Sequence, residues 1–169
     1  TLIDEGIADN TLIFYLADNG APLKFDKKDA PGGGPGWDGS LNDPWIGEKG
    51  MLTEGGIRVP LIASWPAKIP AGQVDDRPVI SFDAIATSVS AAGQKIDSRL
   101  DGVDLLPYLD GRNGTDPHKS LYWRWAGQYA VRSGNWKYLK AGQRSYLFDL
   151  TTDQHEAKNL IELYPERAD

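Results

Sequence analysis

The sequence of 169 residues contains no cysteine, and this absence excludes several chemistries. Without a thiol, the chain has no disulfide, no thiolate nucleophile and no cysteine ligand for zinc or an iron–sulfur cluster. It has only two histidines, His118 and His155, so neither a histidine-rich metal site nor a Ser-His-Asp triad is expected. Any catalysis would therefore depend on carboxylates, amides, lysines, hydroxyls or a hard cation.

Positive charge and long apolar runs are also scarce. The chain has 18 basic and 24 acidic side chains, a formal net charge of −6, which disfavours a nucleic-acid partner because phosphate contacts need clustered Lys and Arg. No run approaches the roughly 18 apolar residues of a membrane span, and no signal peptide opens the sequence. With 40% apolar residues, the chain is predicted to be globular, with no membrane association.

The first third of the sequence predicts part of an α/β sheet. Residues 11–17 (TLIFYLA) form a nearly continuous apolar run, as expected for a strand buried on both faces in a parallel sheet. Residues 59–65 (VPLIASW) predict a second strand of this kind. Residues 18–56 lie between them, contain a Pro/Gly cluster at 31–36 and show no sustained period, so they are predicted to be mostly loop. Because one buried strand cannot form a sheet alone, this part is expected to belong to something larger.

Glycines mark the ends of the predicted helices. Residues 1–6 have the pattern of a last helical turn stopped by a glycine. A helix is predicted over residues 83–92, with Gly93 as its C-terminal stop, and a shorter helical turn over 103–109.

The last third of the sequence predicts a small antiparallel sheet followed by a closing helix at 156–163. The predicted strands cover residues 121–125, 129–132, 136–140 and 146–148. The fold class is therefore α/β, and α+β at the C-terminal end: a remnant of a large mixed sheet flanked by helices, plus a small four-stranded antiparallel sheet with a helix. The expected domain division is 1–114 and 115–169.

Two polar residues directly follow the first predicted strand. Asp18 and Asn19 offer hard oxygen donors where α/β sheets bind their ligands, and such donors suit Ca²⁺ or Mg²⁺. Alternatively, Asp18, Asn19 and Gly20 simply form a tight turn, since all three residue types favour turns.

A lysine lies between glycines further along the chain. Lys49, in the sequence GEKG at 47–50, could neutralise an oxyanion approached closely by the backbone, or it could be an ordinary solvated loop lysine. Glu54 and Arg58 lie just beyond it and are predicted to form a structural ion pair that fixes the loop.

The order of these segments resembles the C-terminal portion of type I sulfatases, the formylglycine-dependent members of the alkaline phosphatase superfamily. The matching segments are 10–20 (NTLIFYLADNG), 47–60 (GEKGMLTEGGIRVP), 101–106 (DGVDLL), 129–139 (YAVRSGNWKYL) and 146–160 (YLFDLTTDQHEAKNL). They are collinear and span essentially the whole chain, so together they form a specific resemblance.

The resemblance implies a hydrolase of sulfate esters, such as an arylsulfatase, and assigns roles to three residues. Asp18 and Asn19 would be metal ligands for a divalent cation, calcium or magnesium. Lys49 would be a catalytic residue that contacts the sulfate group. Residues 54–60 would be mainly architectural. Ala17 stands where the family usually has Ser, a change outside the inferred ligands.

The family's nucleophile is a formylglycine made from Cys or Ser in a Cys/Ser-x-Pro/Ala-x-Arg motif, and this chain contains no such motif. The resemblance therefore implies that residues 1–114 are the C-terminal part of a catalytic domain and 115–169 a C-terminal subdomain. The N-terminal part of the same polypeptide would supply the nucleophile and the remaining ligands. The chain by itself is expected to be an inactive fragment.

Aromatic residues gather in the predicted antiparallel sheet. Trp125, Arg124 and His118 are candidate substrate-binding residues for a sulfated small molecule or a glycan, since an indole can stack on a sugar ring. Alternatively, these aromatics pack the sheet against its helix.

Two other functions remain open from the sequence. One is a phosphatase or phosphonate monoester hydrolase of the same superfamily, since the ester types differ little in shape. The other is a non-catalytic carbohydrate-binding module, which predicts glycan binding by residues 115–169 alone. The resemblance further implies a periplasmic or secreted location.

Overall fold

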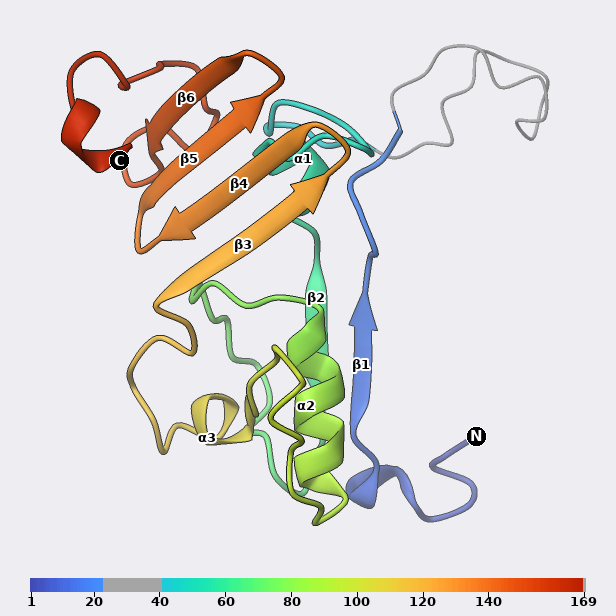
Figure 1. Cartoon of the computed structure of the whole chain (residues 1–169). Coiled ribbons are helices and arrows are strands. Elements are labelled where there is room, and N and C mark those ends of the chain that lie inside the picture. Colours follow the sequence, from blue (N-terminus) through green and yellow to red (C-terminus); the bar gives the residue numbers. More distant parts are fainter. Residues whose placement is uncertain (23–40, 169) are drawn as a thin grey trace, which may run out of the picture. The chain divides into compact units, whose positions relative to one another are not determined.

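The computed structural model describes residues 1–22 and 41–168, which fall into two compact units (Figure 1). Unit 1 consists of Thr1–Leu16 and Pro60–Lys119, and unit 2 of Ala17–Val59 and Ser120–Asp169. The Pro/Gly cluster at 31–36 lies outside the described residues. The domain boundary after residue 114 stays a prediction.

The strands of unit 1 pair with each other. β1 (Ile13–Leu16) and β2 (Leu61–Ser64) are antiparallel, with Ile13 opposite Ser64. Ile13, Tyr15 and Ile62 are 44%, 68% and 59% exposed. The prediction of strands buried on both faces of a parallel sheet is therefore wrong for the described residues. Within the described residues this sheet has no third strand, so neither β1 nor β2 is enclosed as a central strand of a parallel sheet would be.

The helices of unit 1 mostly follow the glycine signals. α2 (Phe82–Ala91) is followed by Gly93 at φ +71°, which confirms the predicted stop, and α3 (Leu106–Leu109) confirms the shorter helical turn. A 3-10 turn, η1, covers Ala8–Asn10. Residues 1–6 form one hydrogen-bonded turn that ends at Gly6, as predicted. The N–H of Ile7 donates to the Leu2 carbonyl at 3.1 Å, the N–H of Gly6 donates to the Ile3 carbonyl at 3.0 Å, and Gly6 has the positive φ of +68° that this kind of helix end requires.

Unit 2 contains the predicted antiparallel sheet, in the order β3-β4-β5-β6 (Figure 1). The strands are β3 (Ser120–Trp125), β4 (Gln128–Ser133), β5 (Trp136–Ala141) and β6 (Arg144–Asp149). Two-residue turns connect them, and Gly134 and Gly142 adopt the positive φ that such hairpins favour. This part of the fold prediction is confirmed.

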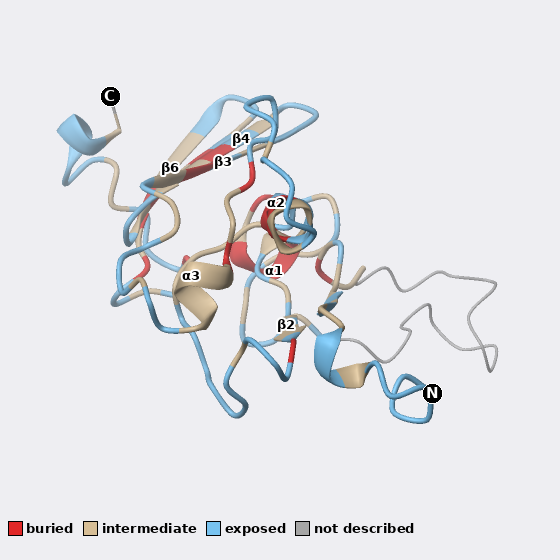
Figure 2. Ribbon diagram, turned by 90° about the horizontal axis from the view of Figure 1, so that it is seen from below, coloured by how far each residue is buried: buried red, intermediate tan, exposed pale blue. Residues whose placement is uncertain are grey.

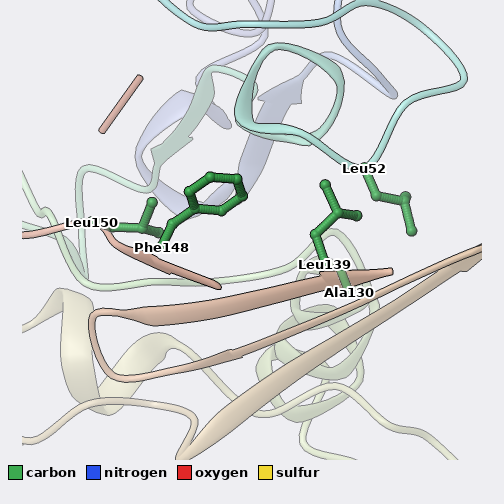
Figure 3. Packing of buried hydrophobic residues seen from close by; sticks show 5 residues of the cluster. All are labelled: Leu52, Ala130, Leu139, Phe148 and Leu150. Atoms are coloured by element: carbon green, nitrogen blue, oxygen red, sulfur yellow. The ribbon is translucent and has the colours of Figure 1, made fainter. Parts of the chain in front are cut away.

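One face of the sheet carries the core of unit 2. Ala130, Leu139 and Phe148 project from consecutive strands and pack with Leu52 and Leu150, as Figure 3 shows. Trp123 and Tyr146 lie against the same cluster, so these aromatics serve the core. Because side chains alternate along a strand, the register places Gln128 and Lys137 on this face too.

The predicted closing helix at 156–163 is wrong. The segment forms turns, followed by a 3-10 turn, η2 (Pro165–Arg167). The Asp153 carboxylate accepts the N–H groups of Ala157 and Lys158, and the N–H of Leu160 donates to the Leu147 carbonyl at 2.8 Å. These N–H groups are directed to a side chain and to the sheet, where a helix would direct them to carbonyls four residues back.

Candidate active site

The turn after β1 begins unit 2 and carries the two predicted cation ligands. Asp18 is exposed, Asn19 is half-buried and Gly20 is buried. Within the described part of the chain, the Asp18 carboxylate has no hydrogen-bond or ion-pair partner. The Asn19 side-chain amide donates to the Gly20 carbonyl at 3.0 Å, which leaves its carbonyl oxygen as an acceptor. The chain therefore bends at Asp18 and Asn19, and this turn of the chain presents hard oxygen donors.

Lys49 lies in a tight loop shaped by glycines. Gly47 and Gly50 have φ values of +105° and +88°, which only glycine adopts without strain. The N–H of Met51 donates to the Glu48 carbonyl at 2.9 Å and closes the turn. The Lys49 side chain is exposed, so its ammonium is available to an anion.

Both segments pack against the short helix α1 (Glu54–Ile57) through glycines. A Cβ on Gly20 would lie 1.8 Å from the Gly55 carbonyl oxygen, and a Cβ on Gly56 would lie 2.0 Å from the Met51 oxygen. The Gly20 N–H donates to the Gly56 carbonyl at 2.9 Å. Backbone therefore lies directly on backbone here, and the buried α1 glycines are visible in Figure 2.

Asn42, which the sequence did not single out, joins the Asp18–Asn19 turn to the Lys49 loop. Its Oδ1 accepts the Ala21 N–H at 2.6 Å, and its Nδ2 donates to the carbonyls of Ala21 at 2.8 Å and Gly47 at 2.9 Å. The Lys49 N–H also donates to the Ala21 carbonyl, at 3.4 Å. The structure thus brings the backbones of the two predicted site segments together. A lone Asn gives no sequence signal for such a role.

A second amide fixes the other side of the Lys49 loop. Gln128, at the start of β4, donates to the Gly50 carbonyl at 2.8 Å and accepts the Leu52 N–H at 3.1 Å. Its register partner Trp125 lies beside the same loop, since the indole nitrogen is 3.6 Å from the position of a Gly50 Cβ. Trp125 is 59% exposed. Sequence reasoning named Trp125 and missed Gln128.

The other two candidate substrate residues make contacts of their own. Arg124 precedes it in β3 and therefore projects from the opposite face, where its guanidinium lies 5.3 Å from the centre of the Tyr129 ring. His118 belongs to unit 1, where its Nε2 lies 2.9 and 3.0 Å from the oxygens of the buried Asp83. The substrate-binding roles of Arg124 and His118 stay predictions.

A cluster of buried ion pairs holds the helix α1, against which the candidate site packs. Lys137 on β5 pairs with Glu54 at 2.8 Å and with Glu156 at 2.7 Å, and all three side chains are buried. The guanidinium of Arg58 also pairs with Glu54, at 3.7 Å. The predicted structural ion pair of Glu54 and Arg58 is therefore confirmed. Sequence reasoning missed Lys137, which makes the shorter contact.

Burial raises the pKa of the Glu156 carboxyl above its usual range, against the opposing pull of the Lys137 ammonium. Oε2 of Glu156 accepts the Glu54 N–H at 2.6 Å, so this carboxylate also holds the start of α1. Its Oε1 is close to Lys137 as an ion pair but lacks hydrogen-bond geometry.

The donors present suit a hard cation without completing its site. Carboxylate and amide oxygens are the ligands of Ca²⁺ and Mg²⁺, and calcium takes about six to eight oxygens. Among residues 1–22 and 41–168, no group of three or more His, Asp or Glu side chains could hold a metal ion. Asp18 and Asn19 therefore fit as two ligands of a larger set. The described residues also contain no helix long and apolar enough to cross a membrane.

Comparison with known proteins identifies the family. The family described as N-sulphoglucosamine sulphohydrolase, C-terminal, matches residues 44–167. N-acetylgalactosamine-6-sulfatase from Canis lupus familiaris is 38% identical over 138 residues, which cover 80% of this chain and 24% of that protein. The chain thus spans about a quarter of this curated relative.

Solved structures of sulfatases and related hydrolases resemble this chain as well. The crystal structure of Ps i-CgsB in complex with k-i-k-neocarrahexaose is 30% identical, with a TM-score of 0.80, and the match covers 99% of this chain and 36% of that one. A phosphonate monoester hydrolase of Agrobacterium radiobacter shares the fold at 22% identity and a TM-score of 0.73, over 99% of this chain and 34% of its own. The chain therefore belongs to the sulfatases of the alkaline phosphatase superfamily, as a member of the C-terminal sulphohydrolase family.

Proposed function

We propose that this chain supplies the C-terminal part of the active site of a sulfatase that hydrolyses sulfate esters of a small molecule or a glycan. Asp18 and Asn19 serve as two ligands of a divalent cation, calcium or magnesium, and Lys49 contacts the sulfate. One observation carries the proposal: the turn with the two oxygen donors and the loop with the lysine are hydrogen-bonded to each other through Ala21 and Asn42.

The residues divide the work by charge. A bound divalent cation would polarise the sulfate oxygens and offset their charge. The Lys49 ammonium binds an oxygen of the same group and stabilises negative charge that develops as the ester bond breaks. Trp125, exposed beside the Lys49 loop, offers an apolar face to the organic part of the substrate. A glycan is a fitting substrate class, because a related structure carries k-i-k-neocarrahexaose.

The nucleophile belongs to other residues of the complete polypeptide. This chain has no cysteine, and no serine lies in a Cys/Ser-x-Pro/Ala-x-Arg motif, so no residue here can become the formylglycine of the family. Residues 1–169 alone are expected to release no sulfate from an aryl sulfate. Turnover by this purified fragment would contradict the proposed division of the site. A periplasmic or secreted location stays part of the proposal.

Steady-state kinetics of the complete polypeptide test the proposal. With 4-nitrophenyl sulfate, Lys49→Ala is expected to lower kcat/KM by roughly 10²–10³-fold, the typical effect of removing one electrostatic stabiliser. Asp18→Asn is expected to raise the calcium concentration needed for half-maximal activity. Lys140→Ala, which removes an exposed lysine of β5, is the matched control. Unchanged kcat/KM in Lys49→Ala would overturn the role of Lys49.

Two further measurements address specificity. A phosphonate monoester hydrolase shares this fold, so kcat/KM should be compared between 4-nitrophenyl sulfate and a phenyl phosphonate monoester, with the sulfate expected to be preferred. Trp125→Ala is expected to raise KM for a sulfated oligosaccharide more than KM for 4-nitrophenyl sulfate. Equal changes for both substrates would argue against stacking on a sugar ring.

A further inference from the structure

We infer that Asn42 is a positioning residue, one that sets where Lys49 lies relative to the turn carrying Asp18 and Asn19. This inference rests on the proposed function. Within the described residues, the Asn42 side chain forms its hydrogen bonds with main-chain atoms of the two site segments. It therefore acts through the residues it holds, and it is distinct from the side chains assigned to cation and sulfate.

The three partners of Asn42 fix the orientation of its amide. The Ala21 N–H requires an acceptor, while the Ala21 and Gly47 carbonyls both require donors. Only a carboxamide with Oδ1 toward the N–H and Nδ2 toward the two carbonyls satisfies all three groups. Two of these bonds pair the Asn42 amide with the N–H and the carbonyl of Ala21, much as a neighbouring strand pairs with a residue in a sheet. The third bond reaches Gly47 in the Lys49 loop.

Within the described residues, the other hydrogen bond between these segments is weaker. The Lys49 N–H lies 3.4 Å from the Ala21 carbonyl oxygen, a long hydrogen bond, whereas the contacts of Asn42 range from 2.6 to 2.9 Å. The Lys49 turn is closed locally by Met51 and Glu48, so it would keep its own shape without Asn42. Without the Asn42 amide, the Lys49 turn should therefore keep its conformation but shift relative to the Asp18 turn.

The decisive variant is Asn42→Ala in the complete polypeptide, assayed with 4-nitrophenyl sulfate at saturating calcium. A misplacement of about 1 Å can cost about 100-fold in rate, and we expect a fall in kcat of this order with a much smaller change in KM. Asn42→Asp has the same size but no donors, and it sets a carboxylate against two carbonyls, so it is expected to lose at least as much.

Asn159→Ala is the matched control. Asn159 also uses its amide for three main-chain contacts, to Leu147, Ile161 and Ser145, in the same unit. Both Ala variants should lower Tm to a similar extent, while only Asn42→Ala should lower kcat. If Asn42→Ala does not fold, Asn42→Ser keeps a short hydroxyl in place and should give a folded protein with an intermediate kcat.

Calcium binding provides a readout independent of turnover. The rise in Tm on adding calcium to the metal-free protein should require about tenfold more calcium in Asn42→Ala, because the ligand turn has lost its anchor at Ala21. Asn159→Ala should give the wild-type calcium dependence. A merely structural role would lower Tm in both variants and leave both calcium curves unchanged.

The inference and the proposed function fail in different ways. If Lys49→Ala lowers activity while Asn42→Ala keeps wild-type kcat and calcium dependence, the positioning role is overturned and the proposed function stands. If Lys49→Ala has no effect, the proposed function itself is overturned. At saturating calcium, Asn42→Ala combined with Lys49→Ala should lose no more activity than Lys49→Ala alone. A fully additive loss would overturn the inference, because Asn42 would then act independently of Lys49.

Discussion

The ammonium of Lys137 lies 2.8 Å from the carboxylate of Glu54, and their side chains are 0% and 3% exposed. This pair joins a strand of the sheet to the helix against which the Asp18 turn and the Lys49 loop are packed. A buried pair of this kind adds little over an apolar substitute, but the loss of one partner leaves an uncompensated charge. The position of α1, and with it the candidate site, is therefore expected to depend on Lys137.

Lys137→Met should strongly destabilise the protein. The substitution leaves the carboxylates of Glu54 and Glu156 buried without their cation, which typically costs about 3–5 kcal/mol. Urea unfolding of the complete polypeptide measures this loss. Lys140→Met, at an exposed position of the same strand, should change the free energy of unfolding little. Equal effects of the two substitutions would mean that the buried ion pairs contribute nothing specific.

The raised pKa of Glu156 predicts a pH dependence of stability. Its carboxyl binds its proton more tightly when folded than at its ordinary pKa of 4.5, because burial disfavours the charge. The native state therefore holds more protons than the unfolded state at pH values between these two pKa values. The contribution of Glu156 to stability is fully present below pH 4.5 and is lost as the pH rises through the folded pKa.

Glu156→Gln removes this titrating group and tests the prediction. The difference in free energy of unfolding between wild type and Glu156→Gln should have its full value at and below pH 4.5 and should shrink as the pH rises above it. Urea titrations at several pH values measure the difference, in which the titration of other groups largely cancels. A difference that grows with pH would contradict the predicted direction of the pKa shift.

Gly20→Ala should damage the site even though it adds one methyl group. The new Cβ would lie 1.8 Å from the Gly55 carbonyl oxygen, so backbone must move. Overpacking of this kind costs about 1–3 kcal/mol, and here it would also displace the turn with Asp18 and Asn19. We expect a lower Tm and weaker calcium binding.

Gly114→Ala is the control for this substitution, since a Cβ there would have no neighbour within 4 Å. It should be neutral or slightly stabilising, because alanine reduces the freedom of the unfolded chain. A similar loss of calcium binding in both variants would show that the close contact of Gly20 with Gly55 is not what holds the turn.

His118→Ala separates a structural role from substrate binding. The imidazole lies within 3.0 Å of both oxygens of Asp83, which also accept the N–H groups of Ile80 and Val103. Loss of this partner should lower stability by about 1–3 kcal/mol, the usual cost of leaving a buried polar group short of a partner. KM for a sulfated oligosaccharide should stay unchanged. A raised KM would instead support the substrate role predicted from the sequence.

The parts of the fold that depend on local patterns were predictable. The four strands of unit 2 and the end of α2 follow from alternation and from glycines such as Gly93 and Gly134, whose positive φ the turns require. The closing helix failed because the N–H of Leu160 donates to Leu147, a partner that no local pattern indicates. The burial of β1 failed for a similar reason, since burial depends on which elements cover a strand.

The residues of the candidate site likewise fall into those that a local sequence pattern indicates and those that it does not. Asp18, Asn19 and Lys49 could be named because their segments resemble those of a family. Asn42 and Gln128 could not, because each acts by holding main-chain groups that only the folded chain brings to it. Amides of this kind look like ordinary loop or strand residues in the sequence.

The glycine contacts around α1 fix the backbone of the candidate site without using the exposed side chains around it. The placement of the Asp18 turn and the Lys49 loop depends on main chain packed on main chain and on the amides of Asn42 and Gln128, and little on the exposed apolar side chains nearby. Leu41, Ile46 and Met51 are 68%, 49% and 42% exposed on this segment, so they are free to change without moving the backbone. Under the proposed function, such a framework would let one set of charged groups serve differently shaped substrates through surface substitutions alone.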